Sequence, residues 1–460
     1  MRRSIVRVVA MVVLGQVAVF SQVEPDQDAS VSANMAVSYE LTHIVNSSYA
    51  RAGDVTNDNW LDNYFLQTIS SYMIVEAKVR EKLRMHVKFL GALMFTLPDE
   101  ASPNGSPVKY VFGNMRGAYL SYAFGEAANP AADLTIGYFP FNYSPETRAL
   151  GAYLFKSGTY PGYVMSGDGE ARLAGIHLAT RLPEIIYHDL FFTTEIDIWP
   201  VYDMSLSYLA RYGVGEVLEI NAGAMFYRLL RTYQGYRAYR QTFIGDVVLS
   251  DNLEKVAFVE DGDTTWYSKS GVKLMGRACL DINKIVKSSR LGENDLKLYA
   301  EAAVLGVKNY TGYYEDIFER IPLMVGFNVP TFGLLDVLAV EGEYYGSPYK
   351  NDADPRGAPV PYESHEYEYM LFNEEVIVDS DDPYKTLTDV RAGAGQKAKD
   401  DNFRWALWAE KTIKDRFTIS AKVASDHLRV LRSDGEYDSH ERLFSPTEWY
   451  WQLRLFASIF

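Results

Sequence analysis

Cysteine is almost absent from this chain of 460 residues, in which Cys279 stands alone. A single thiol excludes an intramolecular disulfide framework and a cysteine-rich zinc site. Positive charge is scarce as well, since 45 Lys and Arg residues oppose 60 Asp and Glu residues and leave a net charge of −15. An acidic chain lacks the basic field that nucleic-acid binding needs, so we expect no nucleic-acid partner.

The sequence also lacks the motifs of common enzymes. No pair among its seven histidines has zinc-protease spacing, and neither a Gly-x-Ser-x-Gly element nor a glycine-rich phosphate loop occurs. We therefore expect no enzymatic activity, no cofactor and no metal site.

Long apolar runs are missing beyond residue 20, so no transmembrane helix is expected there. The one apolar run, Ile5 to Phe20, follows Arg2 and Arg3 and precedes a polar, acidic stretch. It is short for a helical span, which needs ~20 residues. This order of segments predicts a signal peptide over residues 1–21 and an exported mature chain. A membrane anchor or a buried helix is the alternative interpretation.

Alternation of apolar and polar residues is what the chain has in abundance. From Leu83 to Leu97, for example, the odd positions Leu83, Met85, Val87 and Phe89 share one face, while Arg84, His86 and Lys88 share the other. A strand places alternate side chains on opposite faces. About 16 such segments occur: 31–44, 64–80, 82–97, 108–125, 132–141, 170–182, 187–199, 203–213, 216–231, 265–282, 295–308, 318–329, 334–346, 402–413, 416–427 and 447–460.

The length of these segments indicates a membrane barrel. Many reach the ~9–11 tilted residues that cross a bilayer, and in lipid a sheet must close because no water can satisfy its edges. The connections alternate between short and long, with one exception near Pro200–Tyr202, as periplasmic turns and extracellular loops do. We therefore predict an all-β fold, in which residues 22–460 form one transmembrane antiparallel β-barrel of about 16 strands.

Aromatic residues make up 14% of the chain, with 34 Tyr among them. Trp and Tyr favour membrane–water interfaces because one end of each ring is apolar and the other polar. Several cluster at predicted strand ends, such as Trp449 to Trp451. We interpret them as aromatic girdles, while a sandwich core or carbohydrate contacts are the alternatives.

The chain resembles a bacterial outer-membrane porin. The resemblance is carried by the signal peptide, the alternating strands with sorted loops, the terminal Phe460, and the element Gly137, Phe139, Pro140 and Phe141. That element is similar to the one that precedes the third loop of phosphate-selective porins. The resemblance implies the outer membrane as location and lipid partner, a homotrimer, and residues 142–169 as a constriction loop folded into the lumen.

A polar inner face would place a defined set of charges in the lumen, where a pore lined by charge selects ions. Basic candidates on the strands and in the loop, and acidic candidates on other strands, are Lys78, Arg80, Arg84, His86, Lys88, Arg148, Lys156, Lys273, Arg277, Glu301, Glu341 and Glu343. The basic ladder on the second and third strands favours anions, but opposed acidic walls would instead create a transverse field. A third interpretation is that some of these charges pair across neighbouring strands and only stabilise the wall.

The longest connection, 347–401, carries 13 acidic residues against 6 basic ones. We expect a long, acidic, extracellular loop, with a calcium site or an extra hairpin at Met370 to Val378 as alternatives. Taken together, these features predict a channel for passive diffusion of small hydrophilic or charged solutes. The rival hypotheses are a non-conducting barrel that displays its loops for adhesion or polysaccharide binding, a secreted soluble β protein, and a barrel hydrolase.

Overall fold

The structure is a computed structural model of the whole chain. It describes the following residues: 29–47, 61–79, 81–96, 108–127, 129–155, 171–181, 185–194, 196, 203–230, 241–244, 247–250, 255–260, 263–268, 270–307, 316–347, 402–430 and 441–459. The expected signal peptide, the second half of the loop 142–169, the acidic loop beyond residue 347 and Phe460 lie outside these ranges.

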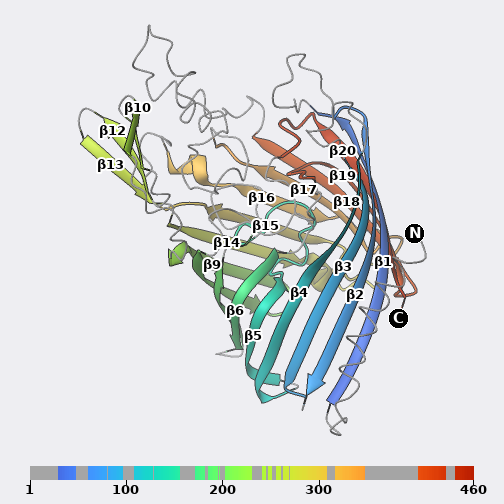
Figure 1. Cartoon of the computed structure of the whole chain (residues 1–460). Helices are drawn as coiled ribbons and strands as arrows, with labels where there is room; N and C mark the ends of the chain where they lie inside the picture. The colour runs from blue at the N-terminus through green and yellow to red at the C-terminus, as the bar shows by residue number, and fades with distance from the viewer. Residues whose placement is uncertain are drawn as a thin grey trace, which may run out of the picture.

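Sixteen antiparallel strands close into one barrel (Figure 1). Each barrel strand pairs with the next barrel strand along the chain, including β9 with β14. The barrel closes where β1 pairs with β20, from Ala36↔Ser458 to Asn46↔Trp449. The barrel strands are β1 (Ala29–Asn46), β2 (Tyr64–Val79), β3 (Leu83–Thr96), β4 (Val108–Glu126), β5 (Asn129–Phe141), β6 (Ala171–Arg181), β7 (Ile186–Thr194), β8 (Met204–Val214), β9 (Leu218–Leu230), β14 (Gly271–Asp281), β15 (Lys297–Val304), β16 (Leu323–Asn328), β17 (Val337–Tyr344), β18 (Phe403–Ile413), β19 (Phe417–Ser425) and β20 (Trp449–Ser458).

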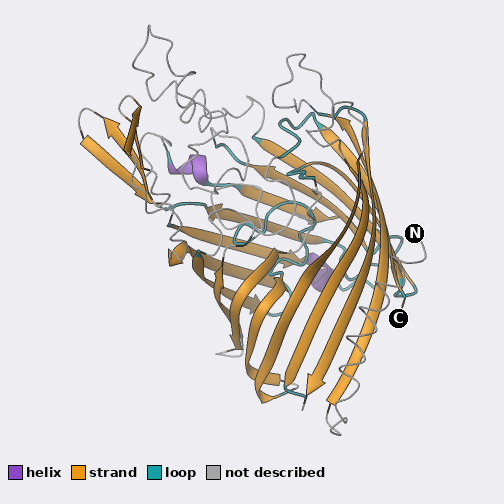
Figure 2. Ribbon diagram, in the orientation of Figure 1, coloured by secondary structure: helices purple, strands orange, loops and turns teal. Residues whose placement is uncertain are grey.

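The other elements of the described residues lie in the connections between barrel strands (Figure 2). Between β9 and β14 the chain forms two hairpins outside the barrel, β10 (Gln241–Ile244) with β11 (Val247–Ser250) and β12 (Lys255–Glu260) with β13 (Asp263–Ser268). A short helix, α2 (Ile282–Val286), follows β14, and a 3-10 turn, η1 (Ile317–Arg320), precedes β16. Within the described ranges, no helix has the length and apolar character needed to cross a membrane.

The alternation of apolar and polar residues in the sequence gives the barrel wall an apolar outer face and a polar inner face. Leu274, Val325, Val340 and Leu407 point outward and keep 41–46% of their surface exposed. Their strand neighbours of the other parity, such as Glu341, point into the barrel and are buried. An exposed apolar wall is stable in hydrocarbon and not in water, so the chain forms a transmembrane barrel.

Aromatic rings gather on the outer wall at the extracellular ends of β1, β2 and β20. The rings of His43 and Phe65 stack with their centroids 4.0 Å apart, and Trp451 meets His43 edge-on at 5.6 Å. Tyr450 points the other way and is buried. These outer rings form part of the predicted aromatic girdle, whereas Tyr450, which was also predicted to belong to it, lies in the interior.

The predicted segments coincide with the sixteen barrel strands to within a few residues at most ends. Two differences have local causes. The predicted strand 265–282 joins β13 of the outer hairpin to β14 of the barrel. The predicted strand 318–329 begins at Leu323, because Asp316 and Glu319 form a capping box that starts η1 in its place.

Candidate functional site: a loop held inside the barrel

The site begins where β5 ends. Residues 142–155, here called the inward loop, leave the wall through a turn in which the Asn142 side chain accepts the Ser144 N–H at 2.8 Å. Gly151 has a φ of 78°, which a glycine adopts without strain. A Cβ at this glycine would meet the Met324 side chain on β16, so the loop tip lies directly against the wall.

The entry to the loop also depends on close strand packing. Gly137 has a φ of 132°, and a Cβ there would collide with the backbone of Ala118 and Tyr119 on β4. Two residues later, Phe139 faces inward with 2% of its surface exposed. The element Gly137 to Phe141, which resembles the one before the third loop of porins, therefore packs β5 closely against β4 just before the inward loop begins.

Glu341 on β17 is the first anchor of the inward loop. Its carboxylate accepts the backbone N–H groups of Arg148 at 2.6 Å, Ala149 at 2.8 Å and Leu150 at 2.9 Å. It also accepts the phenol of Tyr299, from β15, at 2.9 Å. Four donors satisfy the lone pairs of a buried carboxylate, which would otherwise be costly to remove from water.

Glu301 on β15 is the second anchor, two residues of loop farther on. It accepts the N–H of Ala152 at 3.1 Å and that of Tyr153 at 2.7 Å. The Tyr143 phenol, from the start of the loop, donates to the same carboxylate at 2.7 Å. Burial and the neighbouring Glu301 carboxylate both raise the pKa of Tyr143, so this phenol keeps the proton that it donates.

Tyr153 is held by two further wall residues. Its phenol donates to Glu343 on β17 at 2.6 Å, and its carbonyl accepts from Lys273 on β14 at 2.8 Å. Burial and the Glu343 carboxylate raise the pKa of the Tyr153 phenol well above its usual value. Both wall residues are almost fully buried beneath the loop.

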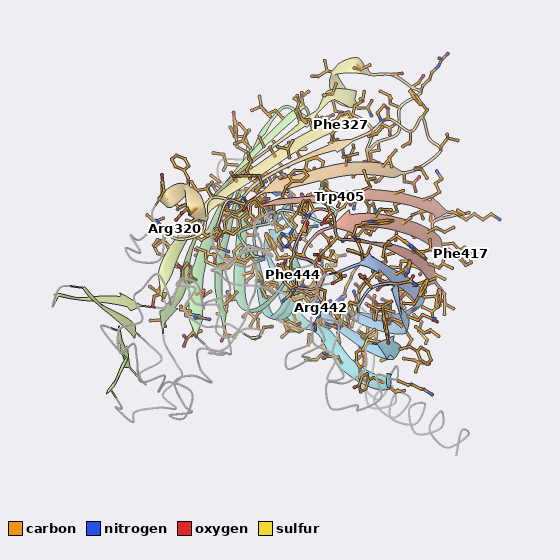
Figure 3. All side chains as sticks on the ribbon, turned by 90° about the horizontal axis from the view of Figure 1, so that it is seen from above. Arg320, Phe327, Trp405, Phe417, Arg442 and Phe444 are labelled. Atoms are coloured by element: carbon orange, nitrogen blue, oxygen red, sulfur yellow. The ribbon has the colours of Figure 1, made fainter. Side chains whose placement is uncertain are left out.

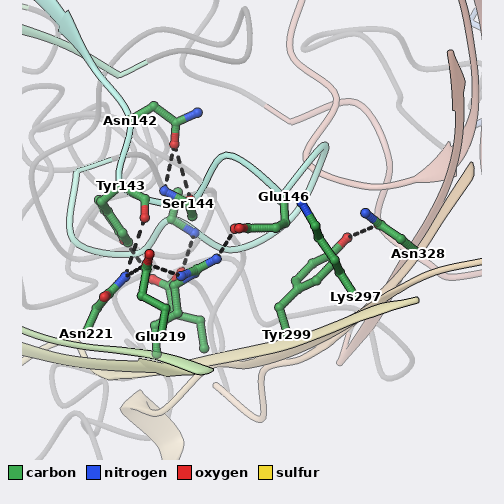
Figure 4. A network of polar contacts seen from close by, with 12 residues as sticks. Asn142, Tyr143, Ser144, Glu146, Glu219, Asn221, Lys297, Tyr299 and Asn328 are labelled. Atoms are coloured by element: carbon green, nitrogen blue, oxygen red, sulfur yellow. Dashed lines mark hydrogen bonds and ion pairs between the residues drawn. The ribbon is translucent and has the colours of Figure 1, made fainter. Parts of the chain in front are cut away.

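A third group of contacts joins the first turn of the loop to β9 and β14 (Figure 4). Arg277 pairs with Glu146 of the loop and, at 3.2 Å, with Glu219 on β9. Asn221 donates to the Glu219 carboxylate at 3.0 Å and lies 3.5 Å from the Tyr143 carbonyl. The polar contacts of the loop from Tyr143 to Tyr153 are thus made with one wall, formed by β9 and β14–β17.

The geometry of this wall requires one further glycine. A Cβ on Gly326 of β16 would collide with the ring of Tyr299. Gly326 lies between Tyr299 and Glu341 in the strand register. The absence of a side chain lets the Tyr299 ring cross β16 and reach the Glu341 carboxylate on the next strand.

Apolar packing completes the attachment on the other side of the loop. Phe155, at the end of the described part, meets Phe141 and Phe191 edge-on at 5.7 Å and 4.9 Å. Phe191 stacks on His177 with the centroids 4.3 Å apart. Leu150, Leu154 and Phe155 have at most 1% of their surface exposed, so this part of the loop is packed as tightly as a protein core.

The residues proposed from the sequence fall into two groups. The first lies under or in the inward loop, and consists of Arg148, Lys273, Arg277, Glu301, Glu341 and Glu343. In this group the five wall residues face the interior but are covered by the loop, with exposures of 0–3%. Their part in ion selection stays a prediction, whereas their contacts to the loop are direct.

The second group lies on β2 and β3, away from these anchors. Lys78 and Arg84 are exposed on the inner face. His86 lies 3.2 Å from Glu76, and the Lys88 ammonium lies 5.3 Å from the centre of the Tyr72 ring. The remaining two candidates, Arg80 and Lys156, lie outside the described residues.

Sequence reasoning missed the tyrosines that complete the site, namely Tyr143, Tyr153 and Tyr299. As a residue type, tyrosine suggests the membrane interface first, although Tyr299 has the inward parity of its strand. That parity is the one signal that could have identified it. Among the described residues, no group of three or more His, Cys, Asp or Glu side chains is arranged to hold a metal ion.

Comparisons with known proteins found matches among solved structures alone. No family model matches the chain, and no curated protein matches it. Among solved structures, Pseudomonas putida OprB has a TM-score of 0.46 at 9% identity, over 93% of this chain and 94% of its own. A triple mutant of the Rhodopseudomonas blastica porin has a TM-score of 0.39 at 6% identity, over 94% of this chain and 100% of its own.

The pairwise identities are too low to transfer any residue role. The role of each residue is therefore inferred from this chain's own geometry. Closed barrels of sixteen strands are wide enough to contain an aqueous channel.

Proposed function

We propose that the chain is a porin-like channel of the bacterial outer membrane, through which small hydrophilic solutes diffuse passively. The observation that carries the proposal is a wide closed barrel with an apolar outer wall, in which one loop is bound to the inner wall by buried carboxylates. Such a loop narrows a lumen without filling it, because the strands of the opposite wall keep water-exposed polar residues, including Lys78 and Arg84.

We further propose that the passage favours anions. The acidic residues Glu301, Glu341 and Glu343 are occupied by donors of the inward loop and have 1–2% of their surface exposed. A passing ion cannot contact these carboxylates beneath the loop, and the buried cations Lys273 and Arg277 lie in the same cluster and offset part of their charge. The basic residues of β2 and β3, represented by Lys78 and Arg84, are then the charges that a solute meets.

The test is a reversal potential measured in a salt gradient across a planar bilayer. Arg84→Ala and Lys88→Ala should move the reversal potential toward cation preference, and the double variant should move it farther. Lys284→Ala is the matched control, because Lys284 lies on α2 at the periplasmic rim, where it is paired with Glu216. An unchanged reversal potential in the double variant would exclude the basic ladder as the source of selectivity.

A non-conducting barrel that displays its loops for adhesion or polysaccharide binding is the second candidate, favoured by the long extracellular connections. Purified, folded protein that binds a polysaccharide but never conducts would support it over the channel. The proposed channel assembles as a homotrimer, which light scattering in detergent would test.

A further inference from the structure

A second part of the chain enters the barrel from the connection between β19 and β20. Residues 426–430 and 441–448, here called the second inward segment, are tied together by the Arg442 N–H, which donates to the Leu428 carbonyl at 2.9 Å. Figure 3 shows Arg442 and Phe444 within the ring of strands. Arg442 and Glu441 are buried, although both carry charge.

The second inward segment packs against the part of the inner wall that adjoins the inward loop. Its Leu443 is fully buried in a cluster with Ile44, Ala406, Ala424 and Tyr450 from four barrel strands. Ala149 of the inward loop and Leu428 of the second segment pack against this cluster. Two stretches of chain separated by almost 300 residues therefore meet inside the barrel.

A histidine joins the two stretches through one wall carboxylate. His427 Nε2 lies 2.7 Å from Glu343, and its Nδ1 lies 2.8 Å from Glu441. The other oxygen of Glu343 accepts the phenol of Tyr153 from the inward loop. Glu441 also meets Arg404 of β18 at 3.4 Å. The contacts therefore run from Tyr153 of the inward loop to Glu343 of the wall, and from there through His427 to Glu441 of the second segment.

The geometry indicates which form of the histidine makes these contacts. Both ring nitrogens face carboxylate oxygens, and a neutral imidazole can donate from one nitrogen alone. The imidazolium donates from both, so it is the form that fits. Burial lowers the pKa of His427, but the two carboxylates outweigh burial and raise the pKa to about 10.

The charged groups on the elements that pack around His427 favour a positively charged imidazolium ring there. The surrounding groups are Glu343 of β17, Arg404 of β18, Lys422 of β19, and Asp426, Glu441 and Arg442 of the second segment. The two carboxylates contact the ring directly, whereas Arg404 reaches Glu441 and Lys422 reaches Asp426. The direct neighbours of the ring are therefore both acidic.

We propose that His427 is a positioning residue that locks the second inward segment to the inward loop, so that both together set the size limit of the passage. The inward loop alone would narrow the lumen from one wall. The second segment covers the adjoining wall of β1 and β18–β20, and the lock fixes the distance between the two. The effect on solute size rests on the proposed channel function, while the lock itself is a property of the fold.

The test uses His427→Gln and Glu441→Gln, with His188→Gln as the matched histidine control. His188 lies on the outer wall, where its ring bonds the Tyr208 phenol at 2.6 Å. The first measurement is hydrogen exchange in detergent-solubilised protein. The Arg442 amide should exchange at least about tenfold faster in both lock variants, and at the parental rate in the control. Parental exchange in both variants would overturn the lock whether or not the protein conducts.

The second measurement is liposome swelling with sugars of increasing mass. The lock variants should admit sugars that the parent and His188→Gln exclude. An unchanged size limit together with faster exchange would overturn the role in size selection while leaving the lock in place. Absence of swelling with every protein, the parent included, would count against the channel and against this role together.

A pH profile separates a lock from general loss of structure. In the parent, exchange of the Arg442 amide, corrected for its intrinsic pH dependence, should stay constant around neutrality and rise as the pH approaches about 10. His427→Gln should show raised exchange without this step, since glutamine does not titrate. A step of the same size in both proteins would assign it to another group.

Discussion

The Glu341→Gln substitution tests how the inward loop is held. In the parent, four donors converge on this carboxylate: three backbone N–H groups of the loop and the Tyr299 phenol. A glutamine of the same size keeps one accepting oxygen and places an NH₂ group where the other oxygen was. That group cannot accept from the donors that face it, so about half of the bonds are lost.

The size of the effect follows from the bonds. A hydrogen bond to a charged group contributes about 1.5–3 kcal/mol, and a buried donor left unpaired adds a further cost. Two lost bonds therefore weaken the attachment of the loop by about 3–6 kcal/mol. Since every 1.4 kcal/mol is a factor of ten, opening of the loop should become at least about 100-fold more frequent.

Hydrogen exchange at the Ala149 and Leu150 amides measures this opening directly. Glu410→Gln on β18 is the control, because it makes the same change on a neighbouring strand and leaves intact the backbone carbonyl with which Glu410 accepts the Asp336 N–H. Strand amides of β17 should keep their protection in both variants, since the ladder is intact. Parental exchange at Ala149 and Leu150 in Glu341→Gln would refute the view that this carboxylate anchors the loop.

Two further substitutions probe the wall. Gly326→Ala should lower the stability by about 1–3 kcal/mol through overpacking, because the added methyl group collides with the Tyr299 ring, whereas Gly276→Ala, with open space around it, should leave the thermal midpoint in detergent unchanged. Lys411 lowers the pKa of Asp336 in the turn before β17, so this pair stabilises the fold above the ordinary pKa of an aspartate and loses its effect as the pH falls below it. Because both side chains are over one third exposed, Asp336→Asn should cost less than about 1 kcal/mol, and a larger loss of stability to urea would contradict so small a contribution.

The strands could be predicted from sequence because each residue faces one of two unlike surroundings. Lipid outside and polar groups inside impose a period of two, and a run such as Leu83 to Leu97 shows it without help from any other part of the chain. The period of two does not reveal where another local structure, such as a turn or a hairpin, forms in place of a strand end. The capping box at Asp316 and the hairpin that ends at Ser268 both displaced predicted strand ends.

The site was predicted in part, and the reason is chemical. The inward parity of Glu301 and Glu341 predicted them as interior residues, and the resemblance to porins predicted that the loop after Phe141 folds into the lumen. Their partners are mainly backbone N–H groups, which every residue carries, so the sequence holds no sign of the pairing. His427 is the last residue of the predicted segment 416–427, whereas β19 ends at Ser425. Beyond the end of the strand, alternation does not indicate which way a side chain points.

Single-channel recording from purified protein tests the channel function most directly. The folded state is first established by a β-sheet circular dichroism spectrum and by heat-dependent gel mobility. We expect discrete, stable conductance steps for the parent and larger or noisier steps for Glu341→Gln, whose loop is released from the wall. Folded protein that inserts into the bilayer and gives no steps, in either form, would contradict the channel function.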